Sequence, residues 1–325
     1  MSPPMIGGRP RVAFALVMLL LFLLLPWVAN NYIVRITTTM LMYSALALSW
    51  NFIGGFTGYP SFATAAFFGL GAYIGGVLQN KGLPMALAWL AAGVLVLLFA
   101  AAVGRAILHL KGHYFAIASL VIADVLREII NGLTDLTGGG MGLNLAAPKL
   151  GVNEQARLFY FAMLVIAVAT LATTVLLDRS RLGFGLRCIE QNEDAAIRIG
   201  IRTARFKTAA FALSSVFVGV VGAIYASWIG YIDPGEAFEV LISVKPIVMT
   251  LLGGAGTVLG PVYGAFLFLL LEETVWRNFL KIHSGVLGML VVLLILFLPK
   301  GVLGSGLPQW LVSAWRRGRA ARSGR

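Results

Sequence analysis

The sequence predicts an all-α polytopic membrane protein with about ten transmembrane helices and with both termini in the cytoplasm. Of its 325 residues, 59% are hydrophobic and only 12% are charged, and the mean hydropathy is +0.89. Soluble domains are about 45–50% apolar and about 25% charged, so this much apolar surface cannot be buried inside one globule of this size. The expected solvent for most of the chain is therefore lipid.

The length of the apolar runs supports the same fold class, because a helix needs about 20 apolar residues to cross the hydrocarbon core. The first run also resembles a secretory signal, but Trp27-Val28-Ala29 is a poor cleavage site, which favours an uncleaved span. The expected spans are residues 12–29, 32–53, 61–79, 85–104, 112–130, 158–177, 208–229, 240–258, 261–277 and 284–299.

The basic residues predict the orientation of these spans. The formal charge of +12 could indicate nucleic-acid binding, but basic cytoplasmic loops produce the same excess. With the N-terminus inside, 17 of the 25 basic residues fall in cytoplasmic segments, so we expect no nucleic-acid partner. The divisions are a cytoplasmic tail at 1–11, a first transmembrane block at 12–177, a cytoplasmic loop at 178–207, a second transmembrane block at 208–299 and a basic cytoplasmic tail at 300–325.

The two longest connections differ in character. Residues 131–157 form an external, Gly-rich and electrically balanced segment, which suits a mobile or re-entrant element. Residues 178–207 carry seven basic and four acidic residues, which is more charge than a simple connector needs. This loop is therefore the expected docking surface for a partner.

Nothing in the sequence indicates catalysis. A single cysteine, Cys188, excludes an intrachain disulfide, and the chain has no Cys/His metal pattern and no credible nucleophile–base set. It also lacks the G-x-x-x-x-G-K-[ST] loop that cradles phosphates, so energy from ATP would have to come from a partner. Two G-x-G-x-x-x-G runs lie in apolar spans and predict close helix packing rather than a nucleotide site: Gly69, Gly71 and Gly75, and Gly254, Gly256 and Gly260.

Charged residues inside the expected spans are few. Asp124, Arg127 and Glu128 stand within about one helical turn of one another and predict a local ion pair near the outer end of the helix. The alternative is that this cluster lines a water-filled path. Lys245 and Arg35 are expected to extend toward the outer surface.

Glycine-rich segments interrupt the apolar runs at two places. The segments are 54–62 and 252–261, and Pro60 and Pro261 prevent regular helical hydrogen bonding at the joins. Irregular backbone in a membrane is tolerated only against protein or water, so such breaks often mark the route of a transported solute. Simple tight turns at the cytoplasmic surface explain the two segments equally well.

The loop at 178–207 contains a short predicted helix. Asn192 can cap it, Glu193 and Asp194 in its first turn complement the positive end of the helix dipole, and Gly200 supplies the C-terminal stop. A two-turn helix outside the membrane buries little by itself, so it fits a partner groove, with a solvated or membrane-surface helix as the alternative. Its apolar stripe consists of Ala195, Ala196 and Ile199.

These residues resemble a known family. Residues 194–200 read D-A-A-I-R-I-G and are similar to the E-A-A-x-x-x-G signature of permease subunits of bacterial ABC importers. The wider run at 181–214 resembles the corresponding loop of the branched-chain amino acid permeases. The chain departs from the pattern of that family at two positions, Pro60 and Cys188. Further blocks of resemblance lie at 58–73, 113–117, 137–139, 252–261 and 297–301.

The resemblance implies an ABC-importer permease architecture in the bacterial cytoplasmic (inner) membrane. The implied partners are membrane lipid, a homologous second permease subunit, two ATP-binding subunits and a periplasmic or extracytoplasmic substrate-binding protein. The chain itself would hold no cofactor and catalyse no reaction, while ATP and magnesium would bind in the partner subunits. The implied substrates are leucine, isoleucine and valine.

Two sets of site residues follow from the loop, the breaks and the resemblance. The residues expected to couple the chain to its ATPases are Arg187, Glu190, Asn192, Glu193, Asp194, Ala195, Ala196 and Gly200. The residues expected along the translocation path are Gly55, Gly58, Tyr59, Ser61, Phe62, Tyr114, Asp124, Gly254, Gly256 and Thr257.

Two alternatives remain open at this stage. Related permeases carry other amino acids, urea or short amides, and no residue of this sequence discriminates among these substrates. A stand-alone secondary transporter driven by an ion gradient would also explain the spans and the glycine breaks, with Asp124 as an ion or proton site.

Overall fold

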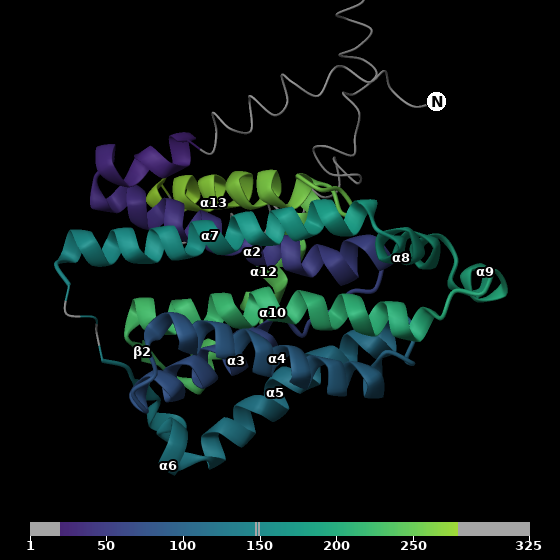
Figure 1. Ribbon diagram of the computed structural model, residues 1–325, viewed down its shortest axis with the longest axis horizontal. Helices are drawn as coiled ribbons and strands as arrows, with labels where there is room; N and C mark the ends of the chain where they lie inside the picture. The colour runs from purple at the N-terminus through teal and green to yellow at the C-terminus, as the bar shows by residue number, and fades with distance from the viewer. Residues whose placement is uncertain (1–19, 147, 149, 279–325) are drawn as a thin grey trace, which may run out of the picture.

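A computed structural model of the chain describes residues 20–146, 148 and 150–278, and most of these lie in helices (Figure 1). The expected tails at 1–11 and 300–325, the expected span at 284–299 and part of the span at 12–29 lie outside the described residues. The longer helices are α2 (Asn31–Thr57), α3 (Thr64–Asn80), α4 (Met85–Ile107), α5 (His113–Gly132), α7 (Val152–Arg179), α10 (Thr203–Ile229), α12 (Leu241–Gly253) and α13 (Gly260–Asn278).

Shorter elements lie at the two ends of this bundle. At one end, the loop between α7 and α10 folds into two helices outside the bundle (Figure 1). At the opposite end, two short strands pair antiparallel, with Leu143 opposite Ile232. The shorter elements are α6 (Thr134–Thr137), the 3-10 helix η1 (Gly139–Met141), β1 (Leu143–Asn144), α8 (Arg181–Gln191), α9 (Glu193–Arg198), β2 (Tyr231–Ile232) and α11 (Pro234–Ala237).

Four of the described helices, α2, α4, α7 and α10, are long and apolar enough to cross a membrane. They differ in burial: the apolar windows of α2 and α10 are 72% and 67% buried, but those of α4 and α7 only 28% and 39%. α10 packs against α2, α3 and α4, and α2 packs against α7, α12 and α13. α2 and α10 are thus the central helices, and the exposed apolar faces of α4 and α7 are suited to lipid. The chain is a multi-pass α-helical membrane protein.

Small residues allow a close helix crossing between α3 and α10. A Cβ atom on Gly71 would lie 2.2 Å from the carbonyl oxygen of Gly219, and one on Gly222 would lie 2.1 Å from the carbonyl oxygen of Phe68. Because backbone cannot move aside cheaply, these positions must lack a side chain for the helices to approach so closely. The predicted packing role of the glycines in the 69–75 run is confirmed at this crossing.

The structure corrects the expected limits of the breaks. α2 continues through Gly54 and Gly55 to Thr57, so the first break begins at Gly58 rather than at Gly54. The second break lies between α12 and α13, and Pro261 is the second residue of α13 rather than part of the join. Proline is compatible with the first turn of a helix because the amide hydrogens there have no intrahelical partner.

The expected span at 240–258 is also shorter than predicted. α12 has 13 residues, which is fewer than the roughly 20 that a complete crossing requires. It begins inside the bundle, where the Ser243 hydroxyl donates a hydrogen bond to the carbonyl oxygen of Phe62. The residues that follow it, 254–258, form the turn of the second break instead of continuing the helix. Hydropathy alone could not separate this turn from a continuous span.

Candidate functional site

The short helix predicted in the cytoplasmic loop is present as α9. The side chain of Asn192 accepts a hydrogen bond of 2.9 Å from the amide of Ala195, which caps the helix as expected. At the other end, Gly200 has φ of 90°, and the amide of Ile201 returns to the carbonyl oxygen of Ala196 at 3.0 Å. Local sequence therefore determines both ends of α9.

A buried ion pair attaches α9 to the transmembrane bundle. The Lys207 ammonium, on the first turns of α10, lies 2.8 Å from the Glu193 carboxylate; the two side chains are 2% and 13% exposed. The hydroxyl of Tyr59 also donates a hydrogen bond to Glu193, and the Lys207 Nζ atom lies 4.2 Å from the centre of the Tyr59 ring. We call these three residues the coupling latch.

The electrostatics of the coupling latch favour one protonation state. Burial raises the pKa of the Tyr59 phenol, and the hydrogen bond to Glu193 raises it further, so the phenol remains a donor. Burial also opposes ionisation of Glu193, but the hydrogen bonds from Lys207 and Tyr59 outweigh it and hold the pKa of this carboxyl below its ordinary value. At neutral pH the carboxylate is therefore ionised and fully engaged.

Tyr59 connects the coupling latch to the core of the bundle. Its ring meets that of Phe115 on α5 edge-on at 5.7 Å, and Phe115 meets Phe211 on α10 at 6.1 Å. Phe211 in turn meets Phe67 on α3 at 5.0 Å. Tyr59 was predicted to line the translocation path, and the structure places it beneath α9, between the loop at 178–207 and the helices α3, α5 and α10.

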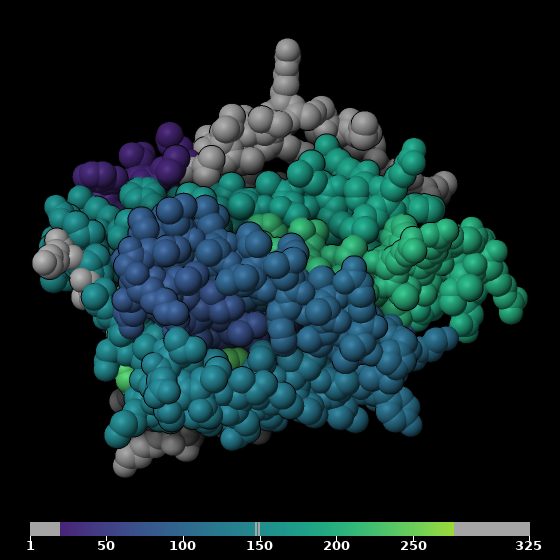
Figure 2. Space-filling view, turned by 60° about the horizontal axis from the view of Figure 1, so that its bottom comes forward, coloured from purple at the N-terminus to yellow at the C-terminus, as the bar shows by residue number. Residues whose placement is uncertain are grey.

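The outer surface of the loop is exposed and partly apolar. Of the expected apolar stripe, only Ala196 packs inward, at 1% exposure, while Ala195 and Ile199 face solvent. Asp194 forms an exposed 3.0 Å ion pair with Lys111, which follows α4. Figure 2 shows this loop (green) as a lobe at one end of the molecule. The exposed large apolar side chains on the lobe are Phe184, Ile197 and Ile199.

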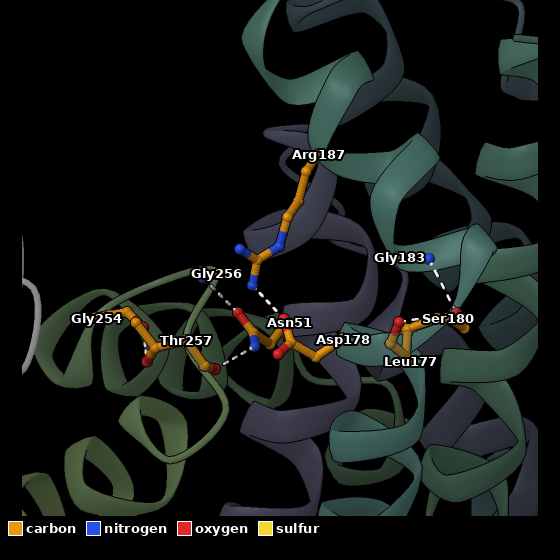
Figure 3. A network of polar contacts seen from close by, with 9 residues as sticks. All are labelled: Asn51, Leu177, Asp178, Ser180, Gly183, Arg187, Gly254, Gly256 and Thr257. Atoms are coloured by element: carbon orange, nitrogen blue, oxygen red, sulfur yellow. Dashed lines mark hydrogen bonds and ion pairs between the residues drawn. The ribbon is translucent and has the colours of Figure 1, made fainter. Parts of the chain in front are cut away.

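The helix α8, which the sequence reading did not separate from the loop, carries two more of the predicted coupling residues. The Ser180 hydroxyl accepts a hydrogen bond from the Gly183 amide and caps α8. Arg187 pairs with Asp178 at the end of α7 (Figure 3), and its guanidinium lies 5.5 Å from the centre of the Phe56 ring. The side chain of Glu190 lies beside Gly58, at the start of the first break. α8 therefore rests on the end of α2.

The backbone of the second break forms hydrogen bonds with a side chain that was not among the predicted site residues. Asn51 on α2 is fully buried, its amide donates to the Thr257 carbonyl oxygen at 2.9 Å, and its side-chain oxygen accepts from the Gly256 amide at 2.8 Å (Figure 3). The Thr257 hydroxyl closes the same turn by donating to the Gly254 carbonyl oxygen at 2.7 Å. A Cβ atom on Gly55 would lie 2.6 Å from the Gly256 nitrogen, so the turn and α2 touch through backbone.

Side chains from neighbouring helices also form hydrogen bonds with the backbone of the first break. Trp50 donates to the Ser61 carbonyl oxygen at 2.8 Å, and the Phe62 amide donates to the Ser119 hydroxyl at 2.9 Å. Ser243 then donates to the Phe62 carbonyl oxygen at 2.7 Å. Irregular backbone within a membrane protein requires such internal partners. Three different helices supply them here, so the break is a specific feature of the fold.

Two of the residues predicted for the path lie on the exposed side of α5. Tyr114 is 75% exposed, and the Asp124 side chain is 54% exposed and lies 3.6 Å from Arg127. Arg127 also lies 3.6 Å from Glu128, so the predicted local ion pair is confirmed. The residues predicted for the path therefore fall into three groups: those on α5, those in the first break and those around the second break.

A cavity of about 590 Å³ lies elsewhere, and none of the predicted path residues lines it. It is bounded by α2, α10, α12 and α13 and contains the charged residues Arg35, Lys245 and Glu272. The signal that could have found it is the presence of ionisable residues within expected spans, which are costly in lipid and usually functional. Within the described residues, no group of three or more His, Cys, Asp or Glu side chains is placed to hold a metal ion.

A membrane-embedded helical bundle with two bonded breaks, a charged internal cavity and an external helical lobe defines a membrane transport protein of the permease class. Residues 32–298 match the family described as branched-chain amino acid transport system / permease component, and the chain belongs to this family. No solved structure matches the chain significantly.

Named relatives include permeases for different substrates. The chain is 26% identical to the high-affinity branched-chain amino acid transport system permease protein LivM of Escherichia coli (strain K12), over 91% of this chain and 76% of LivM. It is 27% identical to the autoinducer 2 import system permease protein LsrC of Yersinia enterocolitica, over 85% of this chain and 80% of LsrC. The family thus serves more than one kind of solute.

Proposed function

We propose that this chain is the transmembrane permease subunit of an ATP-driven importer that moves leucine, isoleucine and valine into a bacterial cell across its cytoplasmic (inner) membrane. The family membership and the similarity to LivM support the transport of branched-chain amino acids. The partners in this proposal are a homologous second permease subunit, two ATP-binding subunits that hold ATP and magnesium, and an extracytoplasmic substrate-binding protein.

The observation that carries the coupling proposal is the coupling latch. α9 is only six residues long, so it cannot hold its own position by helix propensity. The buried pair of Glu193 and Lys207 joins it to α10, and Tyr59 joins the same carboxylate to the first break. A displacement of α9 by the partner ATPases would therefore reach both elements at once.

The mechanism is alternating access driven by a difference in affinity. ATP binds the closed arrangement of the partner ATPases more tightly, and this difference biases the permease between outward-open and inward-open states. The two breaks supply places where helices can change direction without losing hydrogen bonds, because Asn51, Ser119 and Ser243 satisfy their backbone. The permease changes no covalent bond of its substrate.

The exposed lobe would dock on the ATP-binding subunits through Ile197 and Ile199, which are 52% and 70% exposed. Ile199→Asp is expected to reduce copurification of the ATP-binding subunits with the chain. The matched control is Met141→Asp, which changes an apolar side chain of 88% exposure at the opposite end of the bundle. Equal retention of the ATP-binding subunits by both variants would contradict the docking assignment.

Reconstitution tests the transport function and its principal alternative. The full complex in vesicles is expected to accumulate radiolabelled leucine only with ATP, magnesium and loaded binding protein. The chain alone, under a proton or sodium gradient, is expected to accumulate none; uptake in that case would establish an ion-coupled secondary transporter instead. Uptake of urea, a short amide or another amino acid in preference to leucine would support an ATP-driven importer but show that leucine is not its substrate.

A further inference from the structure

The 590 Å³ cavity combines charge with apolar surface in a way that a lipid-facing groove would not. Its volume lies in the range of small-molecule sites. It is lined by the first half of α2, the last turns of α10, the first turns of α12, the second half of α13, Phe68 of α3 and the segment around α11, which places it toward the end of the bundle opposite to α9. In the orientation proposed above, this is the external end.

Six ionisable side chains line the cavity, two basic and four acidic: Arg35, Lys245, Glu236, Glu239, Glu272 and Glu273. Charges at membrane depth are costly in hydrocarbon and face a bundle interior or a water-filled space. Their concentration around one cavity, while α4 and α7 expose apolar residues, indicates that the cavity meets water, protein or a polar solute rather than lipid.

The deeper charges are paired with each other. Lys245 on α12 lies 2.8 Å from Glu272 on α13, and its Nζ atom lies 5.6 Å from the centre of the Tyr43 ring. This pair links the two helices that flank the second break. It leaves the floor of the cavity polar but locally neutral.

Three outer charges have a different environment. Arg35 on α2, Glu236 in α11 and Glu239 just before α12 are exposed, and within the described part of the chain their side chains form neither an ion pair nor a hydrogen bond. They contribute one positive and two negative charges from different elements of the same cavity. Apolar side chains complete the lining: Ile36, Met42, Leu46, Phe68, Ile242 and Leu269.

We propose that this cavity is the site at which the permease receives a zwitterionic amino acid with an apolar side chain. Arg35 contacts the α-carboxylate, Glu236 and Glu239 contact the α-ammonium, and the apolar lining contacts the side chain. This inference rests on the function proposed above and deepens it, because an uncharged polar solute would form an ion pair with none of the three outer charges. The cavity therefore selects within a family whose members serve different solutes.

Cysteine protection tests the site without depending on the selectivity of the binding protein. Cys188 is the only cysteine, so Cys188→Ala followed by Thr39→Cys places a single thiol in the cavity lining. The full reconstituted complex is treated from outside with a cationic methanethiosulfonate reagent. The added solutes are L-leucine, L-leucinamide, which lacks the carboxylate, and 4-methylpentanoate, which lacks the ammonium.

L-Leucine is expected to slow modification of the thiol, and both truncated solutes are expected to protect it less. Adding Arg35→Gln is expected to raise the leucine concentration needed for protection about tenfold or more, because a charge-assisted contact is lost. Adding Glu239→Gln is expected to weaken protection by leucine while changing protection by 4-methylpentanoate little. A cysteine at Gly132, a position with open space around it outside the cavity, is the control and is expected to be unaffected by any solute.

The outcomes separate this proposal from the proposed function. Leucine uptake by the wild-type complex without protection of the thiol, or with equal protection by leucinamide and leucine, would overturn the cavity assignment and leave the importer intact. Gradient-driven uptake by the chain alone would overturn the importer whatever the cavity binds. If Arg35→Gln left the protection by leucine unchanged, the proposed contact between Arg35 and the carboxylate would be wrong.

Discussion

The coupling latch makes a quantitative prediction about Glu193. Glu193→Gln removes the negative charge beside Lys207, whose side chain is only 2% exposed. Removing one partner of a buried ion pair typically costs about 3–5 kcal/mol, because the remaining charge stays desolvated and unpaired. The glutamine oxygen can still accept a hydrogen bond and the site keeps 13% exposure, so we expect the lower end, about 3 kcal/mol.

A loss of this size changes the attachment of α9 rather than the fold of the whole bundle. About 3 kcal/mol corresponds to roughly a hundredfold increase in the population with α9 detached. Hydrogen exchange of the α9 amides in detergent-solubilised complex is expected to accelerate by about that factor, with exchange in α10 beyond its first turns unchanged. In vesicles, ATP hydrolysis is expected to continue while leucine uptake falls, since the motion of α9 no longer reaches α10.

Asp194→Asn is the matched control, because it neutralises the neighbouring acid on the same helix. Asp194 pairs with Lys111, but both side chains are mostly exposed, at 72% and 61%, so the pair is screened by water and salt. Little change in the exchange of the α9 amides is expected. The reasoning would be refuted if Glu193→Gln and Asp194→Asn had equal effects, or if Glu193→Gln together with Lys207→Met were as defective as Glu193→Gln alone.

Three further predictions concern packing, the second break and pH. Gly71→Ala places a methyl group 2.2 Å from the Gly219 carbonyl oxygen and is expected to lower the melting temperature of the purified chain, whereas Gly132→Ala, with open space around it, is not; equal melting temperatures would contradict the close crossing. Asn51→Leu leaves the buried backbone groups at 256 and 257 without their side-chain partner. Denaturant titrations are expected to show that the unfolding free energy falls by about 1–3 kcal/mol. An unchanged unfolding free energy would mean that water replaces the side-chain amide. Because the pKa of Glu193 is held below its ordinary value of 4.5, the stabilisation by the coupling latch is present above that value and is lost as pH falls through the lower folded-state pKa. Protection of the α9 amides from exchange should therefore decrease only in that acidic range in the wild type and be insensitive to it in Glu193→Gln.

Local features of the sequence were sufficient to predict the position and both ends of α9. The cap at Asn192 and the stop at Gly200 each depend on a residue and its immediate neighbours, so composition and spacing identify them. The local ion pair of Asp124 and Arg127 was predictable for the same reason, because residues three apart on a helix are neighbours. The G-x-G-x-x-x-G pattern at 69–75 likewise predicted close helix packing without naming the helix that approaches. The same prediction was wrong for Gly254 and Gly256, which lie in the turn between α12 and α13 with positive φ.

Contacts between distant segments were not predictable in this way. Lys207 was counted among the basic residues of a cytoplasmic loop, and nothing in its neighbourhood indicates that it is buried. Tyr59 and Glu193 are 134 residues apart, and Asn51 is 205 residues from Gly256, so no local period or spacing connects them. Hydropathy also overestimated the length of α12, because the turn at 254–258 has few polar residues and so resembles a continuation of the helix in composition.

The sequence by itself determined that this protein lies in a membrane, that its apolar runs form helices and that a charged loop contains a short capped helix. These properties depend on composition and on nearest neighbours, which one chain displays directly. Only the tertiary structure decided that α9 is fixed to α10 by a buried pair, that α2 supplies the partner for the second break, and that six charges share one cavity. Each of these depends on which helices pack together, and burial changes the energy of a charge or an amide far more than its place in the sequence does.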